Sequence, residues 1–323
     1  MLDTMSPAAA RLPPLEMRYE PVTAAVPGDD VLAVIGYGAA FESGTDPRVL
    51  RVALEPMSQP CVEVWRSTAR VEHGRSGDLR WSHDGDYGFF AIEIDEIDGD
   101  VGAAAQVAYR QLVEHVEAST TPHILRLWNF IDAINEGDGD DERYRRFCEG
   151  RARGMAQFHD ACYPAATAIG GHDGRRRLLV YGLSAREAGT PIENPRQVSA
   201  WRYPRQYGRT APTFARAMST PADQLLISGT AAVVGHASQH EQDLRAQISE
   251  TLANLDSLVA AAQGRFGERA VLKAYVRDAA DAQAVKQAIA DHAAQLGEVL
   301  LLRGDICRRE LLVEIDGMQG LSA

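Results

Sequence analysis

The chain has 323 residues, of which 45% are hydrophobic and 24% charged, and its formal net charge is -12. This length exceeds the size at which a single hydrophobic core usually stops growing, so two domains are expected. The negative charge argues against nucleic acid or an anionic membrane as the main partner, because both repel an acidic surface.

The cysteines and the first residues indicate a cellular compartment. Four cysteines lie far apart, with no CxxC pair among them: Cys61, Cys148, Cys162 and Cys307. This pattern is neither a disulfide framework nor a zinc knuckle. Asp3 stands where a secretory signal carries positive charge, and no apolar run approaches the ~20 residues of a membrane span. We therefore expect a cytoplasmic protein without a membrane segment.

The first half of the chain predicts an alternation of strands and helices. Residues 88–94 form a short apolar run typical of a strand. Between 101 and 116, valine, alanine and leucine recur at three- and four-residue spacing, as on one face of a helix. A further strand is expected at 123–131, followed by an amphipathic helix at 144–158.

The second half predicts the same order of elements. The segment 198–202 ends in Trp-Arg, as the segment 62–66 in the first half does. An apolar run then follows at 224–234, a helical pattern at 244–259 and a strand at 270–276. A last amphipathic stretch covers 282–296. This order predicts an internal repeat that has only scattered identities.

Strands with helices on one face predict an α+β layer fold. The polar, glycine-rich stretch 169–174 is the expected boundary, because few buried contacts should cross it. It divides the chain into domains at 1–170 and 171–323.

Basic and phenolic side chains gather in the segment 200–217. They are Arg202, Tyr203, Arg205, Tyr207, Arg209 and Arg216. Such groups recognise carboxylates, because a guanidinium donates charge-assisted hydrogen bonds to both oxygens. The alternative is a loop that carries surface cations.

The segment 305–317 joins a cysteine to a glutamate in a strand-like run. Glu314 interrupts apolar residues, so it is either an outward-facing side chain or a buried carboxyl. A buried carboxyl has a raised pKa and can donate a proton near neutral pH. Cys307 stands seven positions earlier, so a bend or bulge must intervene if both residues line one pocket.

Tyr144 and Arg151 are also seven positions apart, which places them on one face of the expected helix. The alternative is a solvated helix flank, since several other arginines are nearby.

His236 and His240 have the spacing of metal ligands, but no third ligand is identifiable. Asp243 suits a helix cap instead. We expect no metal site, and the run 175–177 is interpreted as a solvated entry to a strand.

Taken together, these segments resemble the chorismatase family, chorismate-hydrolysing enzymes that include the 3-hydroxybenzoate synthases. The resemblance is carried by 144–154, 200–217, 224–235 and 305–317. The second half also resembles the Rid (YjgF-like) family. The resemblance implies two tandem Rid/YjgF-like (chorismate-mutase-like) units, each a mixed sheet with helices packed on one face. Because the chain is duplicated, a monomer is expected.

The resemblance also implies roles for particular residues. Glu314 matches the family's acid, and a cysteine at the position of Cys307 is associated with product outcome in the hydroxybenzoate-forming branch. Substrate-binding residues are implied at Tyr144, Arg151, Tyr203 and Arg216. The implied reaction converts chorismate to pyruvate and 3-hydroxybenzoate, alone or mixed with 4-hydroxybenzoate, and requires no cofactor.

Two other functions are compatible with the sequence. A Rid-type imine deaminase usually carries a carboxylate-binding arginine on the strand before the closing one. Here that strand, 298–302, has no arginine until Arg303, which counts against deamination. A non-catalytic protein that binds a small organic acid is the other alternative, because the repeat and the arginines would permit it equally.

Overall fold

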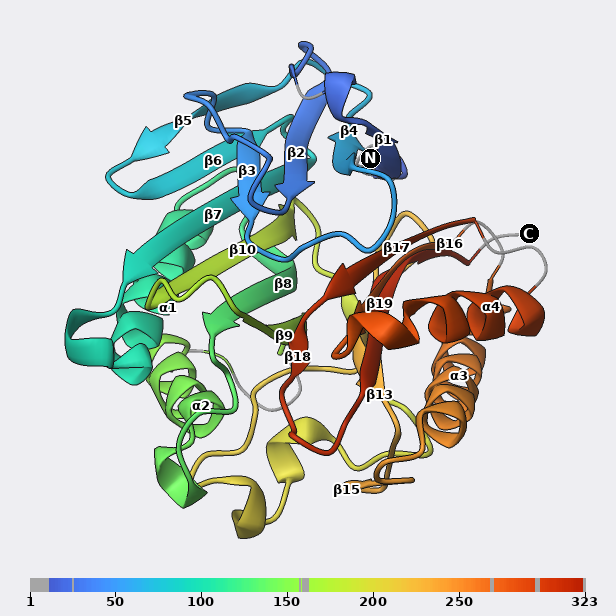
Figure 1. Ribbon diagram of the computed structural model, residues 1–323. Coiled ribbons are helices and arrows are strands. Elements are labelled where there is room, and N and C mark those ends of the chain that lie inside the picture. The colour runs from blue at the N-terminus through green and yellow to red at the C-terminus, as the bar shows by residue number, and fades with distance from the viewer. Residues whose placement is uncertain are drawn as a thin grey trace, which may run out of the picture.

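The computed structural model describes residues 12–24, 26–156, 158, 163–267, 270–293 and 297–321 (Figure 1). Cys162 lies outside the described residues. In Figure 1, helices α1 and α2 lie on one side of the molecule and α3 and α4 on the other, with the sheets between them. Among the described residues, no helix is long and apolar enough to cross a membrane.

The first repeat unit is built on a seven-stranded sheet in the order β18-β9-β8-β10-β7-β6-β5. Its strands are β5 (Glu72–Ser76), β6 (Leu79–His83), β7 (Tyr87–Asp95), β8 (His123–Asp132), β9 (Ala165–Gly171) and β10 (Arg177–Ala185). The short β18 (Asp305–Ile306) comes from the second half of the chain. Helices α1 (Val101–Glu117) and α2 (Arg143–Gly154) pack on one face of this sheet. The carboxylate of Asp100 caps α1 by accepting from the backbone amides of Gly102 and Ala103.

The second unit has a six-stranded sheet in the order β11-β12-β13-β19-β16-β17. Its strands are β11 (Thr190–Ile192), β12 (Ala217–Ser219), β13 (Gln224–Ala231), β16 (Ala270–Val276), β17 (Glu298–Arg303) and β19 (Val313–Gly320). Helices α3 (Leu244–Ala261) and α4 (Ala282–His292) cover one face. As the sequence suggested, Asp243 caps α3 through the amide of Ala246. A two-stranded ribbon joins β14 (Val233–Val234) and β15 (Ala237–Ser238).

A third, four-stranded sheet forms from the first part of the chain. Its order is β1-β4-β2-β3, from β1 (Glu16–Pro21), β2 (Val31–Tyr37), β3 (Val49–Val52) and β4 (Cys61–Arg66). In the apolar core, side chains from this sheet pack with side chains from the faces of both larger sheets that lie away from the helices. The sequence analysis predicted none of these four strands.

Strand pairing confirms the tandem repeat and the predicted α+β class. In the first unit β8 and β9 are parallel, and β10 lies between β8 and β7 with both contacts antiparallel. In the second unit β16 and β17 are parallel, and β19 lies between β16 and β13 in the same way. Each unit is a mixed sheet with two helices on one face, as expected.

Two details differ from the sequence analysis. The similar segments 62–66 and 198–202 have different structures, because residues 200–202 form a 3-10 turn whereas Cys61–Arg66 is a strand. The carbonyl of Val198 there accepts a hydrogen bond from the side chain of Arg216 instead of from a neighbouring strand.

The boundary expected between 170 and 171 falls at the end of β9, yet β10 pairs with β7 and β8. The division into domains stays a prediction, and by strand pairing it would follow Ala185.

The sheets meet around buried ion pairs. Lys273 donates to Glu63 at 2.8 Å, and Arg126 donates to Asp316 at 3.1 Å. Trp128 also donates to Asp316 at 3.0 Å. Buried charges require such partners, because an unpaired charge in this environment costs several kcal/mol. The network fixes β19 against the first unit, two residues from Glu314.

Candidate active site

A cavity of about 470 Å³ lies between the two repeat units. Its walls come from the loop before α2, from α2, from the segment that follows β11, from β13 and from the turn that leads into β19. The lining residues that carry polar or reactive groups include Glu142, Tyr144, Arg145, Tyr203, Tyr207, Arg216, Cys307, Arg308, Arg309, Glu310 and Glu314. In Figure 1, α2 from the first half and β13 from the second half lie in the lower part of the molecule, and β19 is labelled above β13.

Glu314 is buried at the inner wall, with 5% of its surface exposed. Burial, together with the nearby Asp316 carboxylate, raises the pKa of its carboxyl to about 8. Arg126, Arg216 and Arg308 act in the opposite direction. The carboxyl is therefore largely protonated at neutral pH and can donate a proton.

Gly229 lies directly against this carboxyl. An added Cβ at Gly229 would lie 1.9 Å from Oε1 of Glu314, much closer than any two such atoms can approach. Ala231 pairs with Glu314 across β13 and β19 and also lines the cavity. The small residues of β13 thus leave the space that the glutamate occupies.

Cys307 lies in the same cavity as Glu314. The chain turns at 307–310 after β18, and β19 begins only at Val313. This turn supplies the bend that the odd spacing required. Burial raises the pKa of the Cys307 thiol well above its ordinary value, and the proximity of Glu314 adds to the shift. The thiol is therefore protonated at neutral pH, which does not suit a thiolate nucleophile.

Arg216 and Tyr203 form one wall of the cavity. Nη2 of Arg216 donates to the hydroxyl of Tyr203 at 2.7 Å and to the carbonyl of Val198 at 2.8 Å. The Arg216 side chain is 5% exposed, and its Nε has no hydrogen-bond partner in the described part of the chain. A buried guanidinium with an unused donor is well suited to an anionic ligand.

Arg308 provides a second cation near the Glu314 carboxyl. It donates to the carbonyl of His236 at 2.9 Å and to Ser238 at 3.0 Å, and it lies 4.1 Å from the ring centroid of Tyr207. Within the described residues, neither Arg308 nor Arg216 forms an ion pair with a carboxylate. The sequence analysis did not select Arg308, because nothing in the sequence separates it from the neighbouring Arg309.

Tyr144 and Arg151 differ in their placement. Tyr144 lines the cavity from α2, and burial raises the pKa of its hydroxyl. Arg151 is not among the described residues that line the cavity. Its Nη2 donates to the carbonyl of Thr213 at 2.9 Å, and its guanidinium lies 5.1 Å from the Tyr109 ring centroid. Arg151 thereby holds the segment that carries Phe214 and Arg216.

Two other arginines of the segment 200–217, Arg205 and Arg209, form ion pairs at the surface. Arg205 donates to Asp140 at 2.6 Å, and Arg209 donates to the same carboxylate at 2.9 Å. Both arginines are more than half exposed. They tie this segment to the acidic loop before α2, whereas Tyr203 and Tyr207 line the cavity. The described residues contain no cluster of three or more potential metal ligands, and His236 instead contacts the hydroxyl of Tyr207 at 3.3 Å.

The arrangement suits a small molecule with two carboxylates. Two cations without carboxylate partners lie near one protonated carboxyl. Each planar guanidinium can bind one carboxylate through two hydrogen bonds. The buried carboxyl can then protonate an atom held between them.

Comparison with known proteins agrees with this chemistry. Residues 63–184 match the family model described as chorismatase FkbO/Hyg5-like, N-terminal. The chain is 35% identical over 315 residues to a 3-hydroxybenzoate synthase from Streptomyces hygroscopicus, covering 90% of this chain and 92% of that protein. The chain belongs to the chorismatase family.

Two further chorismatases resemble this family member over most of its length. A chorismatase from Streptomyces rapamycinicus is 34% identical over 275 residues, covering 79% of this chain and 81% of that protein. A crystal structure of a chorismatase matches with a TM-score of 0.85 and 30% identity, covering 95% of this chain and 98% of the other. The agreement in both sequence and fold extends over both repeat units, and the protein is an enzyme of this type.

Proposed function

We propose that this chorismatase converts chorismate to 3-hydroxybenzoate and pyruvate, with Glu314 as the acid that starts the reaction. The observation that carries this proposal is the buried Glu314 carboxyl beside Arg216 and Arg308, which have no carboxylate partners among the described residues. The names of the related enzymes support the same substrate and product.

Binding begins with the two carboxylates of chorismate. One carboxylate is on the ring and the other is on the enolpyruvyl side chain, which matches a cavity that has two separate cations. Arg216 and Arg308 would bind one carboxylate each, and Tyr203 and Tyr144 would contact the substrate from opposite walls. Arg151 stays a predicted recognition residue. Its contact with Thr213 supports a positioning role for the segment that ends at Arg216.

Proton transfer from Glu314 then activates the enol ether. The proton adds to the terminal methylene carbon, and the ether carbon becomes an oxocarbenium-like centre. The bond between the ring carbon and the ether oxygen becomes labile, and the oxygen leaves with pyruvate. The raised pKa of Glu314 supports this step, because the carboxyl holds its proton at neutral pH.

The fate of the ring determines the product. If the ring hydroxyl participates and the ring becomes aromatic, the products are hydroxybenzoate and pyruvate, which together contain all the atoms of chorismate. The proton that the ring releases restores the Glu314 carboxyl. If water adds instead, the product is a dihydrodiol acid. Cys307, Ala231 and Val233 line the cavity with Glu314, and the thiol is proposed to favour 3-hydroxybenzoate, alone or with 4-hydroxybenzoate.

The proposal is tested by incubating the purified protein with chorismate in the absence of metal and nucleotide. Pyruvate is measured with a coupled reductase, and the ring product is identified by chromatography and mass. The amount of pyruvate is expected to equal the total amount of hydroxybenzoate, which is 3-hydroxybenzoate alone or with 4-hydroxybenzoate. A dihydrodiol acid as the main product would instead indicate hydrolysis, and unchanged chorismate in the presence of folded protein would contradict the proposal.

A further inference from the structure

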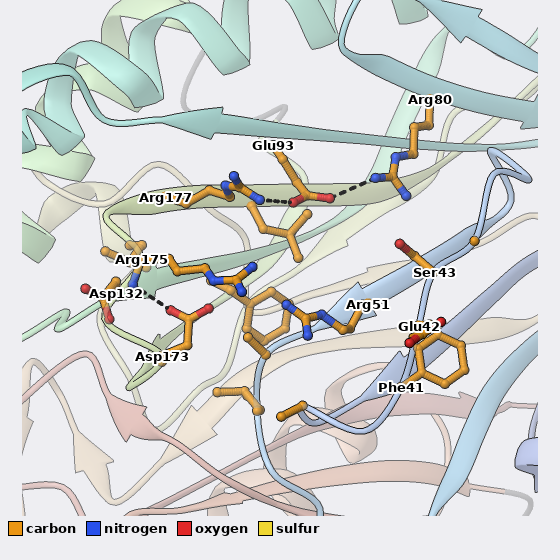
Figure 2. Close-up of a pocket in the computed structure, with 18 residues that line it drawn as sticks. Phe41, Glu42, Ser43, Arg51, Arg80, Glu93, Asp132, Asp173, Arg175 and Arg177 are labelled. Carbon is orange, nitrogen blue, oxygen red and sulfur yellow. Dashed lines mark hydrogen bonds and ion pairs between the residues drawn. The ribbon is translucent and has the colours of Figure 1, made fainter.

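A second cavity, of about 520 Å³, lies between the four-stranded sheet and the first repeat unit (Figure 2). Its walls come from β3, from the loop before β3, from β7 and β8, and from the segment that leads into β10. The aromatic ring of Phe130 and the side chain of Leu179 contribute an apolar surface, and each is 7% exposed. None of the described residues that line this cavity lines the active-site cavity.

Four arginines line this second cavity, and two of them are already paired. Glu93 accepts a hydrogen bond from Arg80 at 3.0 Å and another from Arg177 at 3.1 Å. Arg51 and Arg175, by contrast, form no side-chain hydrogen bond or ion pair within the described part of the chain. Figure 2 shows their guanidinium groups pointing toward one another across the cavity. The carboxylates of Glu42, Asp132 and Asp173 also line the cavity, so its lining is of mixed charge. A ligand carboxylate between Arg51 and Arg175 would accept hydrogen bonds from both guanidinium groups.

The repeat relates this cavity to the active site. Residues 175–181 read RRRLLVY and residues 308–314 read RRELLVE, so Arg175 corresponds to Arg308. The strand register gives the same correspondence independently. Tyr181 pairs with Trp128 on β8, and Glu314 pairs with Tyr275 on β16, which is the strand equivalent to β8. The second cavity therefore retains an arginine equivalent to Arg308 of the active site. The residue equivalent to Glu314 is Tyr181, which is buried in the core and is not among the described residues that line the second cavity.

We propose that this second cavity binds a small planar ring acid with a single carboxylate, and that it does so without converting the ligand. Arg51 and Arg175 hold the carboxylate, and Phe130 and Leu179 contact the ring. The ligand stays unchanged because Tyr181 replaces the acid and is itself fully buried in the core. This site goes beyond the proposed reaction, and its occupancy does not depend on turnover.

The test is an equilibrium titration of the full chain with 3-hydroxybenzoate as the probe. Calorimetry monitors the titration and gives the number of equivalents bound. The double variant Arg51→Ala/Arg175→Ala should bind one equivalent less than the wild-type protein. The single variant Arg175→Ala, on an exposed segment, should weaken this binding by about 10-fold, because a hydrogen bond to a charged group is lost. Arg110→Ala, an exposed change on α1, serves as the matched control and should change nothing.

Three results would overturn the inference. The first is a double variant that is folded, as judged by its thermal unfolding, and binds as many equivalents as the wild type. The second is equal weakening by Arg110→Ala and Arg175→Ala. The third is inorganic phosphate binding at the same site as tightly as 3-hydroxybenzoate, since a ring-acid site should prefer the aromatic probe by at least about 10-fold. Failure of chorismate turnover would leave this readout unaffected.

Discussion

The α-carbon of Gly229 faces the carboxyl of Glu314 so closely that a methyl group there would lie 1.9 Å from Oε1. The glutamate side chain is held in this space by the surrounding strands, and its distal end is the only part that can move. Gly229→Ala should therefore fold but displace the acid. We expect kcat to fall by at least ~10-fold, with a smaller change in the melting temperature than in activity.

The control for Gly229→Ala is a glycine with free space around it. An added Cβ at Gly171 would meet only a Leu54 methyl at 4.0 Å, and its backbone conformation is accessible to alanine. Gly171→Ala should retain wild-type turnover of chorismate. Equal activity of the two variants would show that the position of the Glu314 carboxyl is not critical.

The pH dependence of turnover should follow the protonation state of Glu314. The pKa of this carboxyl is raised to about 8, so nearly all of the protein carries the active, protonated carboxyl well below that pH, and this form is lost above it. We expect kcat to be level between pH 6 and about 7, and to fall tenfold per pH unit well above 8. A profile that rises through pH 8 would indicate a general base instead.

The same raised pKa has a consequence for stability. An acid whose folded-state pKa exceeds its unfolded value stabilises the fold at low pH, and this contribution is lost as the pH rises toward the folded value. For Glu314 the loss should occur between the ordinary value of 4.5 and about 8, at about 1.4 kcal/mol per pH unit. Chemical denaturation should show wild type losing stability relative to Glu314→Gln over this range.

Substrate recognition should depend on the cations that lack carboxylate partners. Arg216→Ala and Arg308→Ala should each reduce kcat/KM for chorismate by ~100-fold, because a desolvated charged hydrogen bond is lost. Arg151→Ala should also reduce kcat/KM, through direct contact or through the Thr213 carbonyl that it holds. Arg146→Ala is the matched control on α2, since that side chain is 44% exposed and pairs with Asp100 at the surface. Similar losses in all four variants would mean that these assignments are wrong.

Cys307→Ala should change the products more than the rate. The thiol is protonated and adjacent to Glu314, so it can guide the collapse of the cation or a proton of the ring without acting as a nucleophile. We expect a measurable rate and a shift between hydroxybenzoates and the dihydrodiol acid. Chromatography of the products checks this. An inactive Cys307→Ala variant, together with a covalent adduct on the wild-type thiol, would contradict this scheme and indicate nucleophilic catalysis by Cys307.

The four helices and the strands β7, β8, β13 and β16 followed from local patterns in the sequence, but the state of Glu314 did not. Side chains alternate along β19, so Val313 and Glu314 point to opposite faces of the sheet. If the sheet were half-solvated, one of these two side chains would be exposed to water. Here α3 and α4 cover one face and the first unit covers the other, so both Val313 and Glu314 are buried. That burial depends on contacts between distant halves of the chain, which periodicity cannot report.

Contacts between distant parts of the chain also explain the other differences between the sequence analysis and the structure. The glycine-rich stretch at 169–174 has the composition of a linker, yet β10 after it returns to pair with β7 and β8. Arg308 is indistinguishable from Arg309 in the sequence, and only the fold places one beside Glu314 and the other against the carbonyls of Asn135 and Gly137. The resemblance to a known family singled out Tyr203 and Arg216 from their neighbours, whereas composition marked only the segment.

The most direct test of the central claim compares wild type and Glu314→Gln under saturating chorismate. Glutamine keeps the size and hydrogen-bonding capacity of the side chain but cannot supply the proton. Pyruvate release should fall by about 10²–10⁴-fold, while chorismate binding, measured separately by calorimetry, stays within a few-fold of wild type. A variant that releases pyruvate at the wild-type rate would contradict the assignment of Glu314 as the acid that begins the reaction.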